Sequence, residues 1–321
     1  MPYRALTRRL PLLLTALGAT VAALTAAAPA ASAQNLPVSY DFLASAAAHA
    51  LAPGTPPPGA NDFSCRPTAA HPYPVVLVHG TLGNMNDNWQ TAAPILANHG
   101  YCVFAFNYGG SSPSSPIQGT GDIATSAGQL AAFVDRVLAA TGAAKVDIVG
   151  HSQGGMMPRY YLDDLGGAAK VATLVGLAPS NYGTTLDGLT VLGRALGIIP
   201  GVNSALSTTC TACVQQESGS AFLAALNADP TAPGVSYTVI ESWDDQVVTP
   251  YTHAFLPTAP NVSNITVNRQ CPLDAADHLE IASDPVAMAD MLNALDPAHP
   301  VRVPCLVVLP LTGPPGPVPA F

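Results

Sequence analysis

Basic side chains are scarce in this sequence of 321 residues. It has 11 lysine and arginine residues against 20 aspartate and glutamate residues, which gives a formal net charge of −9. Nucleic acids and anionic lipid surfaces attract proteins through clusters of basic residues, so the acidic excess excludes both as the main partner. Only 10% of the residues are charged and 32 are prolines, but a hydrophobic fraction of 49% is too high for a disordered chain. The composition therefore predicts a compact, acidic, globular protein.

The amino-terminal segment lacks acidic residues altogether. It carries three arginines, an apolar run at 10–24, and the small residues Ala-Ser-Ala at 31–33. This order is typical of a secretory signal peptide, whereas a transmembrane anchor needs about 20 apolar residues. We therefore expect a cleaved signal peptide at 1–33, no transmembrane anchor, and a secreted, extracellular, monomeric protein. Six cysteines, an even number, fit export because disulfides form in oxidising compartments.

Short apolar runs alternate with helical patterns along most of the chain, and no internal repeat is present. The expected strands are 75–78, 102–106, 146–149, 171–178, 237–240 and 264–267, and the expected helices are 34–50, 88–98, 122–140, 153–165 and 284–295. This alternation predicts an α/β fold with a mostly parallel sheet flanked by helices on both faces.

The domain organisation follows from the irregular segments. We expect a catalytic domain at 61–300, preceded by an amino-terminal helix and a Pro-rich connection at 34–60. A Pro-rich tail at 301–321 should be extended. The Gly-, Thr- and Ser-rich segment at about 182–226 interrupts the alternation as a cap excursion.

A G-x-S-x-G motif spans residues 150–154, between the strand expected at 146–149 and the helix expected at 153–165. Glycines on both sides let the chain turn sharply and lift the serine hydroxyl clear of the sheet. The turn also puts Ser152 at a helix N-terminus, where free N–H groups stabilise developing negative charge. This setting predicts that Ser152 is a catalytic nucleophile.

A serine nucleophile needs a base, and the base needs a carboxylate that orients it. When the serine stands on such a turn, the carboxylate and then the histidine follow it along the chain. Three histidines lie beyond the serine: His253, His278 and His299. Only His278 falls in the loop between the last expected strand and the last expected helix. We therefore predict that His278 is the general base.

The carboxylate should follow the strand expected at 237–240, where Glu241, Asp244 and Asp245 are candidates. The sequence after Asp245 is Gln-Val-Val-Thr-Pro, whose valines and proline would bury and fix the loop. We predict Asp245 as the acid and keep Asp244 as the alternative.

Backbone N–H groups should hold the oxyanion. One belongs to Gln153, the residue after the nucleophile. The second should come from the His-Gly-Thr-Leu-Gly loop at 79–83, with Thr81 the favoured donor and Leu82 the fallback.

Six stretches of sequence read VVLVHGTLGN, GYCVFAFNYG, KVDIVGHSQGGMMPRYYL, LVGLAPSNYGTTL, YTVIESWDDQVVTPY and CPLDAADHL. Together, and spread from about residue 60 to residue 296, they resemble the secreted actinobacterial triacylglycerol lipases of the α/β-hydrolase superfamily. The resemblance implies an α/β-hydrolase fold, secretion, and a triad of Ser152, Asp245 and His278. It places the acid in the D-x-V-V-T-P segment, which supports Asp245. This chemistry requires no cofactor and no metal ion.

The six cysteines allow 15 pairings. We favour Cys65–Cys102, Cys210–Cys213 and Cys271–Cys305, which would tie the start of the domain to a core strand and the tail to the His278 loop. A redox or zinc role for the Cys-Thr-Ala-Cys segment is disfavoured, because no second ligand pair accompanies it.

The cap excursion carries an apolar set that we expect to form a lid or line an acyl pocket, the alternative being an ordinary packed excursion. The set is Leu186, Leu189, Val191, Leu192, Leu196, Ile198 and Ile199. The sequence as a whole predicts a secreted carboxylic-ester hydrolase, foremost a triacylglycerol lipase, acting on a lipid or other ester at a lipid–water interface. Alternatives are an esterase for short-chain or polyester substrates, an acyltransferase, and a catalytically dead binding protein.

Overall fold

The computed structural model describes residues 1–3, 35–185, 188 and 209–320. Six parallel strands form one sheet in the order β2-β1-β3-β4-β5-β6. The strands are β1 (Val75–Val78), β2 (Val103–Phe106), β3 (Val146–His151), β4 (Val171–Leu177), β5 (Ser236–Glu241) and β6 (Val262–Thr266). The strand order reverses between β1 and β3. In parallel sheets a crevice opens at such a point, beyond the carboxyl ends of the strands.

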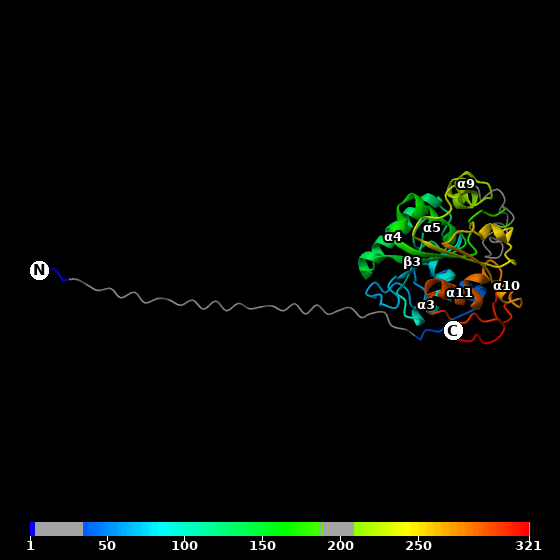
Figure 1. Ribbon diagram of the computed structural model, residues 1–321, viewed down its shortest axis with the longest axis horizontal. Helices are drawn as coiled ribbons and strands as arrows, with labels where there is room; N and C mark the ends of the chain where they lie inside the picture. Colours follow the sequence, from blue (N-terminus) through cyan, green and yellow to red (C-terminus); the bar gives the residue numbers. More distant parts are fainter. Residues whose placement is uncertain (4–34, 186–187, 189–208, 321) are drawn as a thin grey trace.

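Helices cover both faces of this sheet, so the predicted α/β architecture is confirmed. The α-helices are α1 (Phe42–His49), α2 (Met85–Asn88), α3 (Ala92–Asn98), α4 (Ile123–Thr141), α5 (Gln153–Asp164), α8 (Thr211–Gln215), α9 (Ala221–Leu226), α10 (Val267–Gln270) and α11 (Pro285–Leu295). Short 3₁₀ helices are η1 (Gly167–Ala169), η3 (Tyr251–Ala254) and η4 (Glu280–Ala282). Figure 1 shows α4 and α5 on one side of the sheet and α3 and α11 on the other, and each pair packs into its own buried apolar cluster.

Local signals set most of the helix boundaries. The Asp122 side chain accepts the N–H of Thr125 and starts α4, and Gly142 ends it with a φ of 73°. Asp284 caps α11 in the same way. Two expectations were wrong in extent. The helix expected at 88–98 begins only at Ala92, because a separate short helix, α2, starts at an Asn84 capping box and ends at Asn88. The helix expected at 34–50 begins only at Phe42, where Asp41 caps it.

Three disulfides tie loops to this framework. They join Cys65 to Cys102, Cys210 to Cys213 and Cys271 to Cys305, the three pairs that the sequence favours. None of the described helices is long and apolar enough to cross a membrane. Residues 4–33 of the expected signal peptide lie outside the described residues, as do the seven apolar residues of the expected lid.

A small third cluster of buried apolar residues lies apart from the sheet, and we call it the roof cluster. It consists of Phe42, Ala46, Leu82, Val247, Leu279 and Ala282, with Leu311 packed against it. Helix α1 contributes two of these residues and is held by distant parts of the chain. The N–H of Leu43 donates to the Leu311 carbonyl at 2.9 Å, and the N–H of Phe42 donates to Glu280 Oε2 at 3.2 Å. The segment before the expected catalytic domain and the segment after it therefore meet here.

Candidate active site

Ser152 occupies a sharp turn between β3 and α5. Its backbone has a φ of 55°, in the left-handed region that side chains rarely adopt. The turn is possible because both flanking motif positions are glycine. A Cβ at Gly150 would collide with the Gly154 carbonyl, and a Cβ at Gly154 would collide with the Val78 carbonyl of β1. Close packing of strand, turn and helix thus explains both glycines of the motif.

The structure brings Ser152, His278 and Asp245 into one chain of hydrogen bonds. The Ser152 hydroxyl lies 3.0 Å from His278 Nε2, and His278 Nδ1 lies 2.7 Å from Asp245 Oδ2. A carboxylate only accepts, so Nδ1 carries the proton and Nε2 is free to accept the serine proton. His278 and Asp245 are both buried. The three residues are separated by 126 and 33 positions in sequence, so only the fold assembles them.

The Asp245 carboxylate is fixed by its own loop. Its Oδ1 accepts the N–H groups of Val247 and Val248 at 2.7 and 2.8 Å, which leaves Oδ2 for the histidine. Asp244 faces elsewhere, because its Oδ2 accepts the Asn268 amide at 3.1 Å. Of the two adjacent aspartates, the structure brings only Asp245 to His278.

The other two histidines lie away from the serine. His253 contacts Ser218 and the Gly183 carbonyl, and His299 pairs with Asp296 on the surface.

Thr81 follows β1, the strand next to the one that carries Ser152, and lines the same cavity as Ser152. The neighbouring N–H of Leu82 donates to the Gln118 carbonyl at 2.9 Å and is therefore occupied. The N–H of Thr81 has no acceptor within the described part of the chain, and the first amides of α5, including that of Gln153, have no intrahelical acceptor. Two N–H groups are thus available beside the serine hydroxyl, from the two residues that the sequence favours.

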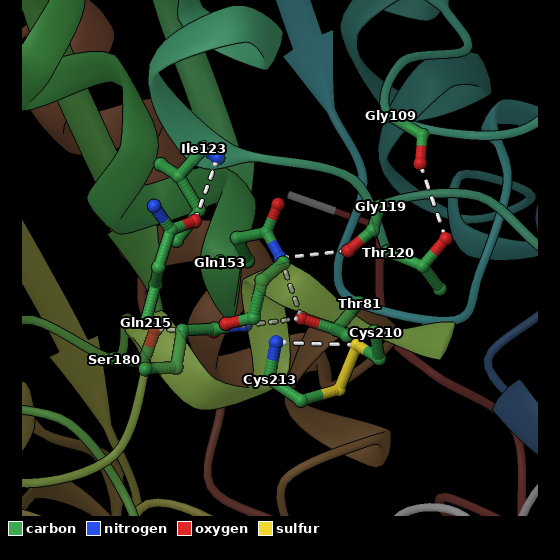
Figure 2. Close-up of a disulfide and its surroundings, with 12 residues drawn as sticks. Thr81, Gly109, Gly119, Thr120, Ile123, Gln153, Ser180, Cys210, Cys213 and Gln215 are labelled. Carbon is green, nitrogen blue, oxygen red and sulfur yellow. Dashed lines mark hydrogen bonds between the residues drawn. A yellow bond between two sulfur atoms is a disulfide. The ribbon is translucent and has the colours of Figure 1, made fainter. Parts of the chain in front are cut away.

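The Thr81 hydroxyl is held by two glutamines. The side-chain amides of Gln153 and Gln216 each donate to Thr81 Oγ1 at 2.9 Å. Figure 2 shows the Gln153 amide between Thr81 and Gly119, beside the Cys210–Cys213 disulfide. With its lone pairs engaged, the Thr81 hydroxyl has its own proton left to donate.

Sequence reasoning missed Gln216. This residue directly follows α8 and is buried, and its Oε1 accepts the Ser180 hydroxyl at 2.8 Å. No motif marks it, because Gln216 is 135 residues from Thr81 and lies within the irregular segment 182–226.

Glu241 is a second buried carboxyl beside the acid. Burial, and then the negative charge of Asp245, raise the pKa of Glu241 well above its ordinary value. Its Oε1 accepts the Ser242 N–H at 2.8 Å, and its Oε2 is buried without a hydrogen-bond partner among the described residues. Burial beside the charge of Asp245 therefore favours the neutral form of Glu241.

His151, the residue before the nucleophile, connects the turn to the histidine loop. Its Nε2 lies 2.8 Å from the His278 carbonyl. Burial, and then the nearby His278, lower the pKa of His151 to about 3. The ring is thus neutral and donates a hydrogen bond to the backbone that carries His278.

The serine lies in a small cavity of about 20 Å³, room for about one water molecule. Phe42 and Ala46 of α1 line it together with Thr81, Ser152 and His278. Ser152 is only 4% exposed, so the roof cluster covers the nucleophile. Among the described residues, no group of three or more His, Cys, Asp or Glu side chains is placed to hold a metal ion.

A parallel sheet with a serine on a strand–turn–helix elbow defines an α/β-hydrolase. Lipase B from Aspergillus fumigatus has this fold, with a TM-score of 0.57 at 18% identity over 81% of this chain and 56% of that one. The chain belongs to the class 2 lipase family, whose profile matches residues 72–289.

Curated relatives agree with this assignment. Triacylglycerol lipases of Pseudarthrobacter phenanthrenivorans and Burkholderia plantarii are each 33% identical to this chain over 169 residues, or 51% of it. The matched segment is 49% of the first relative and 44% of the second. The chain therefore matches about half the length of these relatives.

Proposed function

We propose that this protein is a secreted carboxylic-ester hydrolase that cleaves triacylglycerols. The observation that carries the proposal is the buried chain of hydrogen bonds from Ser152 through His278 to Asp245. Such a chain activates a serine hydroxyl that is a poor nucleophile at its own pKa.

In the proposed reaction, Ser152 Oγ attacks the ester carbonyl and His278 Nε2 takes its proton. Asp245 holds the imidazole in the required tautomer and stabilises the imidazolium that forms. The amides of Thr81 and Gln153 and the Thr81 hydroxyl donate to the oxyanion. His278 then returns the proton to the leaving alcohol. A water activated by His278 cleaves the acyl-enzyme and restores the free serine.

Two observations support an apolar ester as substrate. Curated relatives are named triacylglycerol lipases, and the cavity that holds the serine is roofed by the apolar side chains of Phe42 and Ala46. Export is supported by the three disulfides, which leave no described cysteine free. Extracellular fractions of an expressing culture should contain the protein with its first 33 residues removed.

The test combines a variant with a covalent probe. Purified protein should hydrolyse p-nitrophenyl esters and tributyrin with release of free acid into water, and a fluorophosphonate should label Ser152. Ser152→Ala should lose both activity and labelling. Activity of the variant within tenfold of the unaltered protein would refute the proposal. Turnover only in the presence of an alcohol acceptor, with a new ester and no free acid as the product, would refute it as well.

A further inference from the structure

A second, larger cavity lies directly beside the one that holds Ser152. Its volume is about 290 Å³. Helix α1 forms one wall, with Leu43 and Ala47 among the side chains that face it. Leu82, next to the oxyanion donor, and Ile117 are among those that form the opposite wall. The space is far larger than the cavity at the serine and is lined mostly by apolar carbon.

The two cavities share lining residues. Phe42, Ala46, Asp87 and Leu279 line both of them, so these side chains lie between the larger space and the serine hydroxyl. Leu279 directly follows His278. An ester bound at Ser152 is too large for the small cavity, and its chain reaches an apolar space by passing these four side chains.

The single acidic residue of the lining is already engaged in hydrogen bonds of its own. Asp87 accepts the backbone N–H of Asn84 at 2.8 Å and its side-chain amide at 2.7 Å. Burial raises the pKa of Asp87 to about 7, which favours its neutral form in mildly acidic solution. This carboxyl belongs to the capping box of α2, and both of its oxygens are occupied there.

The mouth of the cavity is rimmed by exposed apolar side chains. Leu43, Leu51 and Ile117 are 40%, 89% and 37% exposed, and all three line it. Large aliphatic side chains gathered at the opening of an apolar cavity mark a binding site for an apolar ligand.

We infer that this cavity between α1 and the oxyanion loop binds an aliphatic chain of the ester substrate. The inference rests on the proposed function, because the serine chemistry fixes the ester at the shared wall. The chain belongs either to the acyl group or to the alcohol, since both are aliphatic and leave the same carbonyl. Helix α1 is then a specificity element, and Ala47 and Ile117 set how much chain the cavity accepts.

The experiment narrows the cavity from each wall. Ala47→Trp fills it from α1 and Ile117→Trp from the opposite side. Ala48→Trp is the matched control, because Ala48 is also exposed on α1 but does not line the cavity. Thermal melts of all three variants verify folding. One substrate series varies the acyl chain from p-nitrophenyl acetate to decanoate, and the other varies the alcohol from ethyl to decyl acetate, both below their solubility limits.

The readout is the ratio of kcat/KM for the longest chain to that for the shortest. One methylene in an apolar pocket is worth about tenfold or more, so we expect the cavity variants to lower this ratio at least about tenfold in one series. A fall in the p-nitrophenyl series assigns the acyl chain, and a fall in the acetate series assigns the alcohol chain. Ratios in both cavity variants equal to that of Ala48→Trp in both series overturn the inference. The proposed function fails separately, if the unaltered protein cleaves neither series.

Discussion

The floor and the roof of the active site are built in different ways. The floor is the carboxyl edge of the sheet, where Thr81, Ser152 and Asp245 each follow a strand. The roof cluster joins α1, three loops and the carboxyl-terminal tail, and long-range hydrogen bonds such as Phe42 to Glu280 and Leu43 to Leu311 hold α1 there. The strand register therefore sets the geometry of the floor, whereas the geometry of the roof depends on packing between distant segments.

This difference predicts different consequences of mutation. Changes in the floor should reduce turnover and leave the fold intact, because the sheet does not depend on the reactive side chains. Changes in the roof should act on stability and substrate range.

The largest expected effect comes from the acid of the floor. Asp245→Asn should lower kcat about 10⁴-fold, because an amide cannot hold His278 in the tautomer that accepts the serine proton. Asp244→Asn, next to it in sequence but hydrogen-bonded to Asn268, should stay within about threefold, as expected for a loop residue outside the triad. Kinetics on p-nitrophenyl acetate measure both. Comparable losses in the two variants would contradict the geometric assignment of the acid.

The next effect concerns the oxyanion side of the floor. Thr81→Val keeps the shape and the backbone N–H but removes the hydroxyl, and we expect kcat to fall about 10²-fold, as for loss of one oxyanion donor. Thr81→Ser restores a hydroxyl that Gln153 and Gln216 can hold, so it should recover most of the activity. A fully active Thr81→Val variant would show that the hydroxyl does not donate to the reacting ester.

Most residues of the floor could be predicted from the sequence. The G-x-S-x-G elbow locates Ser152, and the order of strands and loops singles out His278 among three histidines. Residues 244 and 245 are both aspartate, so sequence alone left them open. What separates their side chains is a pair of backbone N–H groups, from Val247 and Val248, that orient the Asp245 carboxylate.

The roof cluster and the Gln216 contact with Thr81 could not be predicted from the sequence. The amphipathic pattern indicated a helix near residue 42 but not what it covers, because its contacts with Glu280 and Leu311 lie more than 200 residues away. Gln216 carries no local signal for the same reason. Such contacts depend on how the chain closes on itself, which composition and periodicity do not encode.

The next prediction concerns Glu241, the buried carboxyl beside the triad acid Asp245. Glu241→Leu leaves the Ser242 N–H without its acceptor, and we expect kcat on p-nitrophenyl acetate to fall about tenfold, the effect of losing one buried hydrogen bond beside Asp245. Glu241→Gln keeps a neutral side chain whose oxygen still accepts the Ser242 N–H, so it should match the unaltered protein in rate. Equal losses in both variants would mean that the buried acid itself is needed.

The last effect, seen only in stability, belongs to the roof. Burial, and then nearby acidic groups, raise the pKa of Glu280 to about 10, far above the 4.5 of an ordinary glutamate. At a pH between these two pKa values, Glu280 is ionised in the unfolded chain but protonated in the folded chain. The free energy of unfolding therefore falls by about 1.4 kcal/mol for each unit by which the pH rises. Glu280→Gln still accepts the Phe42 N–H and cannot ionise. Urea unfolding at pH 5, 7 and 9 measures the free energy of unfolding. That of Glu280→Gln should rise relative to the unaltered protein as the pH rises. Glu217→Gln changes a half-buried glutamate outside the roof cluster, and its free energy of unfolding should differ from that of the unaltered protein by the same amount at each pH. A constant difference for Glu280→Gln across this range would mean that Glu280 is already ionised in the folded protein and that the roof tolerates its charge.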